Sequence, residues 1–239
     1  MLFPSYLRSP ALDGVSNNDP YFSSVVLLAV NNNAANGSTT FADQSPVART
    51  LTANGNAAYS SASAPTGMTT SMACDGTGDY ISSTNSTDFD FGAGDFTVEA
   101  MVNLSSTATQ IFICKDDVTN RSWHIAWVSS IGWQFAYWVG GVATNYRPGT
   151  GSVSTGTWNH IAASRNTTNL RFYVNGTQVG VANNISTNTI DTKTAVQSVG
   201  ASGAGSFGLN GYISNVRITK GVGRYASAFT APTLPLPTS

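Results

Sequence analysis

Charge is scarce in this sequence of 239 residues: Lys, Arg, Asp and Glu together make up 10%, and the formal net charge is −1. Binding to nucleic acid needs a concentrated positive charge opposite the phosphates, so we expect no nucleic-acid partner. No run of about 18 apolar residues occurs, so the sequence predicts no membrane-spanning helix and no membrane partner. Residues 1–12 contain Arg8 and no apolar stretch, and therefore predict no secretory signal peptide.

Residue types that carry acid–base and redox chemistry are few as well. Glu99 is the single glutamate, and the histidines are His124 and His160. We predict that both histidines are packed, hydrogen-bonded structural residues. Cys74 and Cys114 are too few for a disulfide framework, and we expect both to remain reduced thiols.

Hydroxyl, amide and aromatic side chains are abundant instead. Ser, Thr and Asn compete for backbone hydrogen bonds and disfavour helix interiors, whereas Thr, Val, Ile and aromatic residues favour strands. A hydrophobic content of 41% is enough for a core. The composition therefore predicts an all-β protein, and no break in composition divides the chain.

Short segments with strand propensity follow one another, separated by turn residues. They lie at residues 21–30, 48–53, 71–74, 80–82, 96–103, 110–115, 122–128, 133–139, 159–165, 170–174 and 211–219. Asn175-Gly176 predicts a type I′ turn that joins 170–174 to a following strand. No helix-period segment of useful length is present. Many short strands between turns predict a two-sheet sandwich or jelly roll.

Four segments resemble the laminin-G-like branch of the concanavalin-A-like jelly rolls: CDGTGDYI (74–81), FDFGAGDFTVEAMVN (89–103), TGTWNHIAASRNTTNLRFYVNGTQVG (155–180) and GYISNVRITKGVGRYASAFTAP (211–232). Residues 19–46 resemble the start of such domains in bacteriophage virion proteins. The resemblance implies an all-β, antiparallel two-sheet jelly-roll sandwich with an extended N-terminal arm. We expect the arm at 1–15, the domain at 16–231 and a C-terminal tail at 232–239.

This fold hosts lectins, glycanases, adhesion modules and virion parts, so it does not define the function. The virion resemblance implies a non-enzymatic phage structural protein, most simply a capsid decoration protein, assembled in the host cytoplasm. Its expected partners are a major capsid or tail protein, in a homo-oligomer or in many copies per particle. The apolar anchors of the arm and tail would dock it: Leu2, Phe3, Tyr6, Leu7, Leu234 and Leu236. The alternatives are a tail-associated or glycan-binding adhesin and, less favoured, a glycanase.

The glycanase alternative meets an obstacle in Glu99. Glucanases of this superfamily carry Glu-x-Asp-x-x-Glu, which pairs a nucleophile with an acid across the glycosidic bond. A chain with one glutamate cannot contain that motif. We therefore expect no catalytic residues and no enzyme activity.

Calcium is the one cofactor that the resemblance allows. Laminin-G-like domains often bind it at the rim of the sandwich through aspartates and carbonyl oxygens. The candidate ligands are Asp75, Asp79, Asp116 and Asp117. None forms a diagnostic ligand series, and the alternative is that they stabilise turns.

The densest aromatic run, WQFAYWVGG at 133–141, is the candidate contact surface for a glycan. Trp133, Phe135 and Tyr137 alternate onto one face and Trp138 onto the other. One face must be core. We expect the other to expose Trp138 near Tyr146 and Arg147, where a flat ring stacks on a sugar of a surface polysaccharide. Packing or a protein interface is the alternative.

Overall fold

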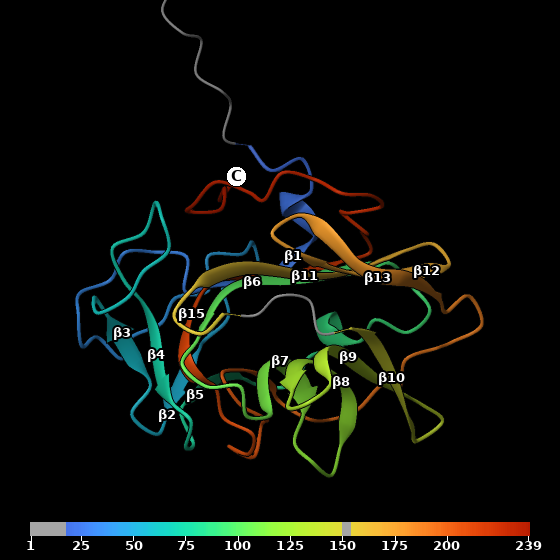
Figure 1. Cartoon of the computed structure of the whole chain (residues 1–239), viewed down its shortest axis with the longest axis horizontal. Helices are drawn as coiled ribbons and strands as arrows, with labels where there is room; N and C mark the ends of the chain where they lie inside the picture. Colours follow the sequence, from blue (N-terminus) through green and yellow to red (C-terminus); the bar gives the residue numbers. More distant parts are fainter. Residues whose placement is uncertain (1–17, 150–153) are drawn as a thin grey trace, which may run out of the picture.

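Two antiparallel sheets, stacked face to face, make up the protein (Figure 1). The computed structural model describes residues 18–149 and 154–239. The larger sheet has the order β13-β12-β11-β6-β15-β4-β3, with β1 paired to β15, and the smaller has the order β10-β9-β8-β7-β14-β5-β2. The all-β, two-sheet prediction is confirmed.

The larger sheet consists of β1 (Val25–Ala29), β3 (Ala58–Ser60), β4 (Ser71–Asp75), β6 (Phe96–Leu104), β11 (Trp158–Asn166), β12 (Asn169–Val174), β13 (Thr177–Asn184) and β15 (Asn210–Lys220). The smaller sheet consists of β2 (Thr52–Asn54), β5 (Tyr80–Ser83), β7 (Gln110–Asp116), β8 (Arg121–Val128), β9 (Gly132–Val139), β10 (Val142–Gly149) and β14 (Gln197–Val199). Two single 3₁₀ turns, η1 (Phe22–Ser24) and η2 (Thr87–Phe89), are the helical elements of the described ranges. No helix within those ranges is long and apolar enough to cross a bilayer.

Period-2 alternation places the core between the sheets. In β6, Phe96 and Val98 point inward and are fully buried, while Thr97 and Glu99 point to the outer side. Phe96 stacks on Phe135 of β9, with ring centroids 5.3 Å apart, so aromatic rings from both sheets fill the interior.

The Asn-Gly turn forms as predicted. Asn175 and Gly176 have φ values of 50° and 77°, and Val174 pairs with Thr177 across the turn. Only glycine fits the second position, because a Cβ on Gly176 would lie 1.9 Å from the Phe229 carbonyl oxygen. The hairpin therefore packs directly against the C-terminal segment.

Three strands were not predicted: β3, β10 and β14. β10 contains Pro148 and carries mostly exposed side chains, as suits an edge strand, so its pattern resembles a loop. β14 has three residues and is held by pairing with both β5 and β7. The N-terminal strand is also shorter than expected, since residues 21–24 form a turn and η1.

The C-terminal tail packs against its own domain, which corrects the expectation that Leu234 and Leu236 await a partner. Leu236 is buried against Val25 and Leu28, and Leu234 packs beside it. The Leu236 amide donates to Asn31 Oδ1 at 2.7 Å, and Asn31 Nδ2 donates to the Leu236 carbonyl at 3.0 Å. The predicted arm anchors, Leu2, Phe3, Tyr6 and Leu7, lie outside the described residues.

Candidate functional site

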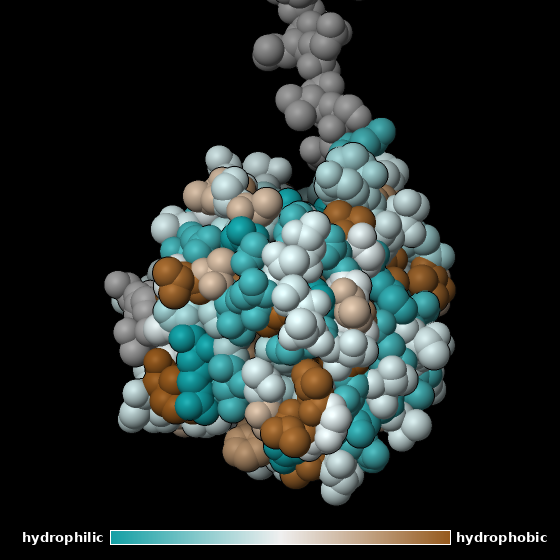
Figure 2. All heavy atoms as spheres, turned by 90° about the vertical axis from the view of Figure 1, so that its right-hand side faces the viewer, coloured by the Kyte–Doolittle hydropathy of each residue, from teal (hydrophilic) through white to brown (hydrophobic). Residues whose placement is uncertain are grey.

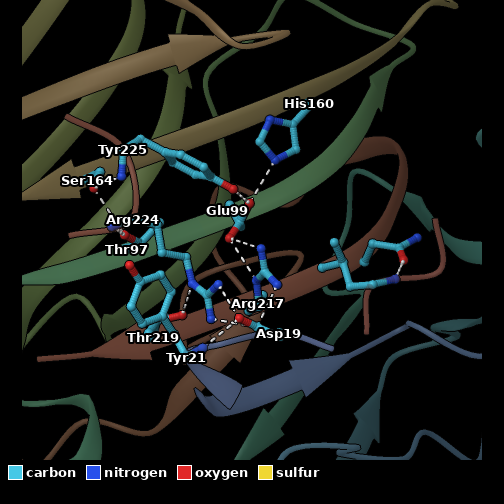
Figure 3. Close-up of polar contacts among 12 residues, drawn as sticks. Asp19, Tyr21, Thr97, Glu99, His160, Ser164, Arg217, Thr219, Arg224 and Tyr225 are labelled. Carbon is cyan, nitrogen blue, oxygen red and sulfur yellow. Dashed lines mark hydrogen bonds and ion pairs between the residues drawn. The ribbon is translucent and has the colours of Figure 1, made fainter. Parts of the chain in front are cut away.

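A buried ion network holds the chain ends against the outer face of the larger sheet (Figure 3). Glu99 of β6 is completely buried and accepts hydrogen bonds on both oxygens. Arg217 of β15 donates to Oε1 at 2.8 Å, while His160 of β11 and the Tyr225 hydroxyl donate to Oε2 at 2.9 and 2.8 Å. His160 is thus a hydrogen-bonded structural residue, as predicted.

Asp19 continues this network toward both ends of the described chain. Its carboxylate pairs with Arg217 at 2.9 Å and with two nitrogens of Arg224 at 2.8 Å. Its amide donates to the Ser239 carbonyl at 2.8 Å. We conclude that this network fastens the segments around Asp19 and Ser239 to the sheet, because each of its carboxylates is buried and paired with a guanidinium.

The charges of the network set each other's ionisation. Burial alone would raise the pKa of Glu99, but the Arg217 charge and the hydrogen bond from His160 outweigh it and hold that pKa well below its usual range. Burial also acts on Asp19, where hydrogen bonds from Arg224 and the Tyr21 amide produce a lowered pKa. Both carboxylates are therefore ionised at neutral pH.

The outer face of the smaller sheet carries a second polar array, in which Arg147 is exposed while Asp116, His124 and Gln134 are buried. Four adjacent strands each contribute one side chain: Asp116 from β7, His124 from β8, Gln134 from β9 and Arg147 from β10. Asp116 Oδ2 lies 2.9 Å from His124 Nδ1, His124 Nε2 lies 3.2 Å from Gln134 Nε2, and Gln134 Oε1 lies 2.9 Å from Arg147 Nε. We call this array the polar ladder.

The polar ladder has one consistent direction of hydrogen bonding when His124 is neutral. An ionised carboxylate only accepts, so Nδ1 of His124 carries the proton that faces Asp116. His124 Nε2 then accepts from the Gln134 amide nitrogen, which leaves the Gln134 oxygen to accept from Arg147. Each side chain thus orients the next, and Arg147 is positioned by a chain that begins at Asp116.

A hollow of about 150 Å³ lies over the polar ladder. Its polar lining includes Asp116, Arg121, His124 and Gln134, and its apolar lining includes Ile111, Ala126, Val128 and Phe207. Trp138 stands beside it with its ring edge-on to His124, and the Arg121 guanidinium lies 5.4 Å from the Trp138 ring centroid. We call the hollow with its bordering Trp138 and Arg147 the ladder groove.

The structure separates the three predicted glycan-contact residues. Trp138 and Arg147 lie on the outer face, whereas Tyr146 points into the core beside Phe135. Trp138 is only 8% exposed and has the Arg121 guanidinium over its ring, so the expectation of an exposed indole is wrong. The reason is register: Tyr146 pairs with Phe135, whose side chain faces inward, and Trp138 pairs with Ala143. The Tyr146 hydroxyl donates to the Val181 carbonyl at 2.9 Å, so this ring closes the core between β10 and β13.

The four predicted calcium ligands do not converge. Asp75 and Asp79 form one pair, in which Asp79 Oδ2 accepts from the Asp75 amide at 3.0 Å. Asp116 belongs to the polar ladder, and Asp117 accepts four hydrogen bonds from Thr119 and Asn120 within its own turn. Over residues 18–149 and 154–239, no three His, Cys, Asp or Glu side chains gather as a metal site would require. The contacts of Asp117 are those expected of an aspartate that stabilises a turn, which is the alternative to calcium binding.

Sequence reasoning missed Asp116, His124 and Gln134 as members of one array. The available signal was a polar residue at an outward position of each aromatic-rich strand: His124 in SWHIAWV and Gln134 in WQFAYWV. That pattern indicates that His124 and Gln134 lie on the outer face of their sheet. It does not give the strand order that makes them neighbours of each other and of Asp116.

Both cysteines are free, as predicted, and both are buried. Cys114 hydrogen-bonds with Ser198 at 3.0 Å, and burial raises the pKa of its thiol to about 12. Cys74 is buried next to Asp75 and Asp79, and its pKa is raised further by the same cause. Neither thiol is a nucleophile in this environment.

Solved structures with the same fold include toxin binding domains and a carbohydrate-bound module. The binding domain of paraclostridial mosquitocidal protein 1 aligns with a TM-score of 0.63 and 12% identity over 88% of this chain and 50% of that one. The receptor-binding domain of botulinum neurotoxin D aligns with a TM-score of 0.60 and 14% identity, over 84% of this chain and 50% of that one. Domain 4 of AbnA, an arabinanase of Geobacillus stearothermophilus solved with arabinotriose, aligns with a TM-score of 0.54 and 18% identity, over 73% of this chain and 82% of that one.

This chain spans about half the length of the two toxin domains, and at these identities the likeness shows the fold alone. No significant match was found among curated proteins. Residues 75–222 match the family model Laminin_G_3, which covers more than half of the sequence. The chain therefore belongs to the concanavalin A-like lectin/glucanases superfamily.

Proposed function

We propose that this protein binds a polysaccharide in the ladder groove and does not cleave it. The observation that carries the proposal is the hollow over the polar ladder, with Trp138 at its border on the outer sheet face. Sugar sites in proteins combine a flat apolar ring, which stacks on the C–H face of the sugar, with fixed polar groups for its hydroxyls. The ladder groove offers both.

The polar groups of the ladder groove are already oriented. Gln134 is held between His124 and Arg147 at 3.2 and 2.9 Å, so little side-chain entropy remains to be lost on binding. Trp138 is held by an edge-on contact with His124 and by the Arg121 guanidinium over its ring. A fixed ring and a fixed amide favour recognition of a rigid polymer over an adaptable protein surface.

A glycan array with the wild type, Trp138→Ala and Trp158→Ala tests the proposal. Trp158 is a half-buried tryptophan on the larger sheet, so its substitution controls for the loss of an indole elsewhere. We expect binding by the wild type and Trp158→Ala and a loss of about tenfold or more in Trp138→Ala. Equal binding by all three variants, or by none, contradicts the proposal.

A reducing-sugar assay on each bound polysaccharide tests whether it is cleaved. We expect no turnover, because the single glutamate, Glu99, is buried in the ion network on the opposite sheet. Turnover by the wild type that disappears in Asp116→Asn would show that the protein is a glycanase. Asp116→Asn is also tested on the glycan array, so that a loss of turnover can be told from a loss of binding.

The second candidate function is a virion structural protein, and the position of the segments around Asp19 and Ser239 favours it. Asp19 and Ser239 are hydrogen-bonded to each other on the side of the larger sheet (Figure 1), while the ladder groove lies on the smaller sheet. A domain attached through these two segments would present the groove outward. Together with the virion-like segment 19–46, this supports a multi-copy capsid decoration protein, with a tail-associated adhesin as the alternative.

The surface on the side of β10, β12 and β13 suits an exposed module. Figure 2 shows polar and neutral residues there, with apolar ones in small separate patches. Val142 and Val181 are among the exposed apolar residues.

Deletion of residues 1–14 tests the virion role. We expect the truncated protein to fold and to be lost from purified particles, as measured by quantitative mass spectrometry against the major capsid protein. Unchanged occupancy would contradict attachment through the N-terminal segment. The position of the wild type in the intact particle, seen by electron microscopy, distinguishes capsid from tail.

A further inference from the structure

Arg147 is the exposed cation beside the ladder groove. Arg121 keeps a third of its side chain accessible, but its Nε pairs with Asp116 Oδ1 at 3.6 Å. Among the hydrogen bonds of the described residues, Arg147 uses only its Nε, which donates to Gln134. Both terminal nitrogens of its guanidinium remain available in a fixed orientation.

The neighbouring carboxylates are committed to other contacts. Asp116 is 2% exposed and accepts from His124 and from the Val118 amide, the latter at 2.7 Å. Asp117 is held by its own turn through Asn120, and hydrogen bonds within that turn overcome partial burial and lower its pKa. Neither presents a free carboxylate to a ligand.

Arg147 also borders a second hollow, of about 380 Å³, on the far side from His124. Polar groups in its lining include Asn145 and Asn183. Arg147 thus lines the second hollow and is hydrogen-bonded to Gln134, which lines the first.

We propose that the ligand of the ladder groove is an acidic polysaccharide, whose sugar carboxylate pairs with Arg147 while a neighbouring ring stacks beside Trp138. This inference rests on the proposed glycan-binding function and adds the ligand class. A planar guanidinium with two free nitrogens matches a carboxylate in bidentate geometry, and charge-assisted hydrogen bonds are the stronger kind. The buried Asp116 assists indirectly, because it orients the polar ladder that holds Arg147.

The test compares each acidic polymer with its own methyl ester, which removes the charge and keeps the sugar. Polygalacturonate and polysialic acid, each free and methyl-esterified, are titrated by calorimetry into the wild type, Arg147→Gln and Arg171→Gln. Arg171 lies on β12 of the larger sheet and controls for the loss of one positive charge. We expect at least one acidic polymer to bind the wild type about tenfold more tightly than its ester, consistent with one charge-assisted contact.

Arg147→Gln should lose that preference, and Arg171→Gln should keep it. The preference should also shrink as salt is raised from about 50 mM to 500 mM, because exposed charges are screened. If acid and ester bind equally, or if Arg147→Gln retains the preference, the acidic ligand class is wrong while glycan binding stands. If no polymer on the array binds and Trp138→Ala changes nothing, the proposed function fails as well.

Discussion

Replacement of Glu99 by glutamine is the sharpest perturbation of the ion network. The side chain keeps its shape and its acceptor toward Arg217, and both the Tyr225 hydroxyl and a His160 protonated on Nδ1 can accept from the new amide group. The hydrogen bonds to this side chain can therefore be remade, although His160 Nδ1 is buried without a partner among the described residues. What the variant loses is charge balance, because Glu99 and Asp19 neutralise Arg217 and Arg224 in the wild type.

The expected cost follows from that burial. Removing one partner of a buried ion pair leaves an uncompensated charge and costs about 3–5 kcal/mol. Arg217 is 5% exposed and Glu99 not at all, so solvent cannot screen the excess charge. For a domain of this size, 3–5 kcal/mol corresponds to a decrease in Tm of roughly 6–20 °C.

Thermal unfolding followed by circular dichroism at pH 7 measures the loss. The matched control is Asp88→Asn, the same change in a carboxylate that pairs with Arg49 and is 42% exposed. That pair should contribute less than about 1 kcal/mol. Similar Tm values for Glu99→Gln and the wild type, or an equal loss in both variants, would refute the reasoning.

The same network predicts a dependence of stability on pH. A carboxylate with a depressed pKa in the folded state stabilises the fold above its unfolded pKa, about 4.3 for Glu, and this contribution is lost as pH falls toward the folded pKa. Glu99 and Asp19 both have lowered pKa values. We expect the wild type to lose stability below about pH 4, and Glu99→Gln to lose less over that interval.

Other variants test the packing of the chain ends and the turn aspartates. Gly176→Ala should destabilise the protein well beyond the roughly 1–2 kcal/mol cost of a positive φ, because its Cβ would meet the Phe229 carbonyl. Gly140 has a φ of +59° and open space around it, so Gly140→Ala should cost only about 1–2 kcal/mol, as measured by urea unfolding. Leu236→Ala should cost about 2–5 kcal/mol if the tail belongs to the core, and no change in the unfolding midpoint would show that it does not. Millimolar calcium should leave the Tm of chelator-treated protein unchanged, since Asp75, Asp79, Asp116 and Asp117 already accept hydrogen bonds; a stabilising shift would reinstate a calcium site.

Local pattern was sufficient to predict the fold class and most of the strands. Alternation along residues 133–138 placed Trp133 and Trp138 on opposite faces, and Asn175-Gly176 marked the hairpin. These features depend on residues close together in sequence. β14 could not be found this way, because three residues form a strand only when β5 and β7 are already beside them.

Alternation failed where the strand is irregular. In β7 a strict period would place Ile111 and Ile113 on the same face. The pairing of β7 with β8 shifts between these residues, so that Ile113 joins the core and Ile111 lies with Cys114 and Ala126 on the outer face. Nothing in the sequence marks that shift, yet it helps to shape the wall of the ladder groove.

The polar groups of both arrays come from distant parts of the chain. Asp19 reaches Arg217 across 198 positions, and the polar ladder needs the order β7-β8-β9-β10 to bring its members together. The composition showed only that charged residues were few. Their partners depend on tertiary register, which alternation and turn chemistry do not supply.

A chain with so little charge has distributed it unequally between its two sheets. On the larger sheet, two carboxylates and two guanidiniums balance each other in a buried network that secures the chain ends. On the smaller sheet, Asp116 is buried and pairs with Arg121 at 3.6 Å, while Arg147 is exposed and donates only to the neutral Gln134 among the described residues. The proposed preference for an acidic over a neutral ligand therefore depends on Arg147, the one cation of the polar ladder.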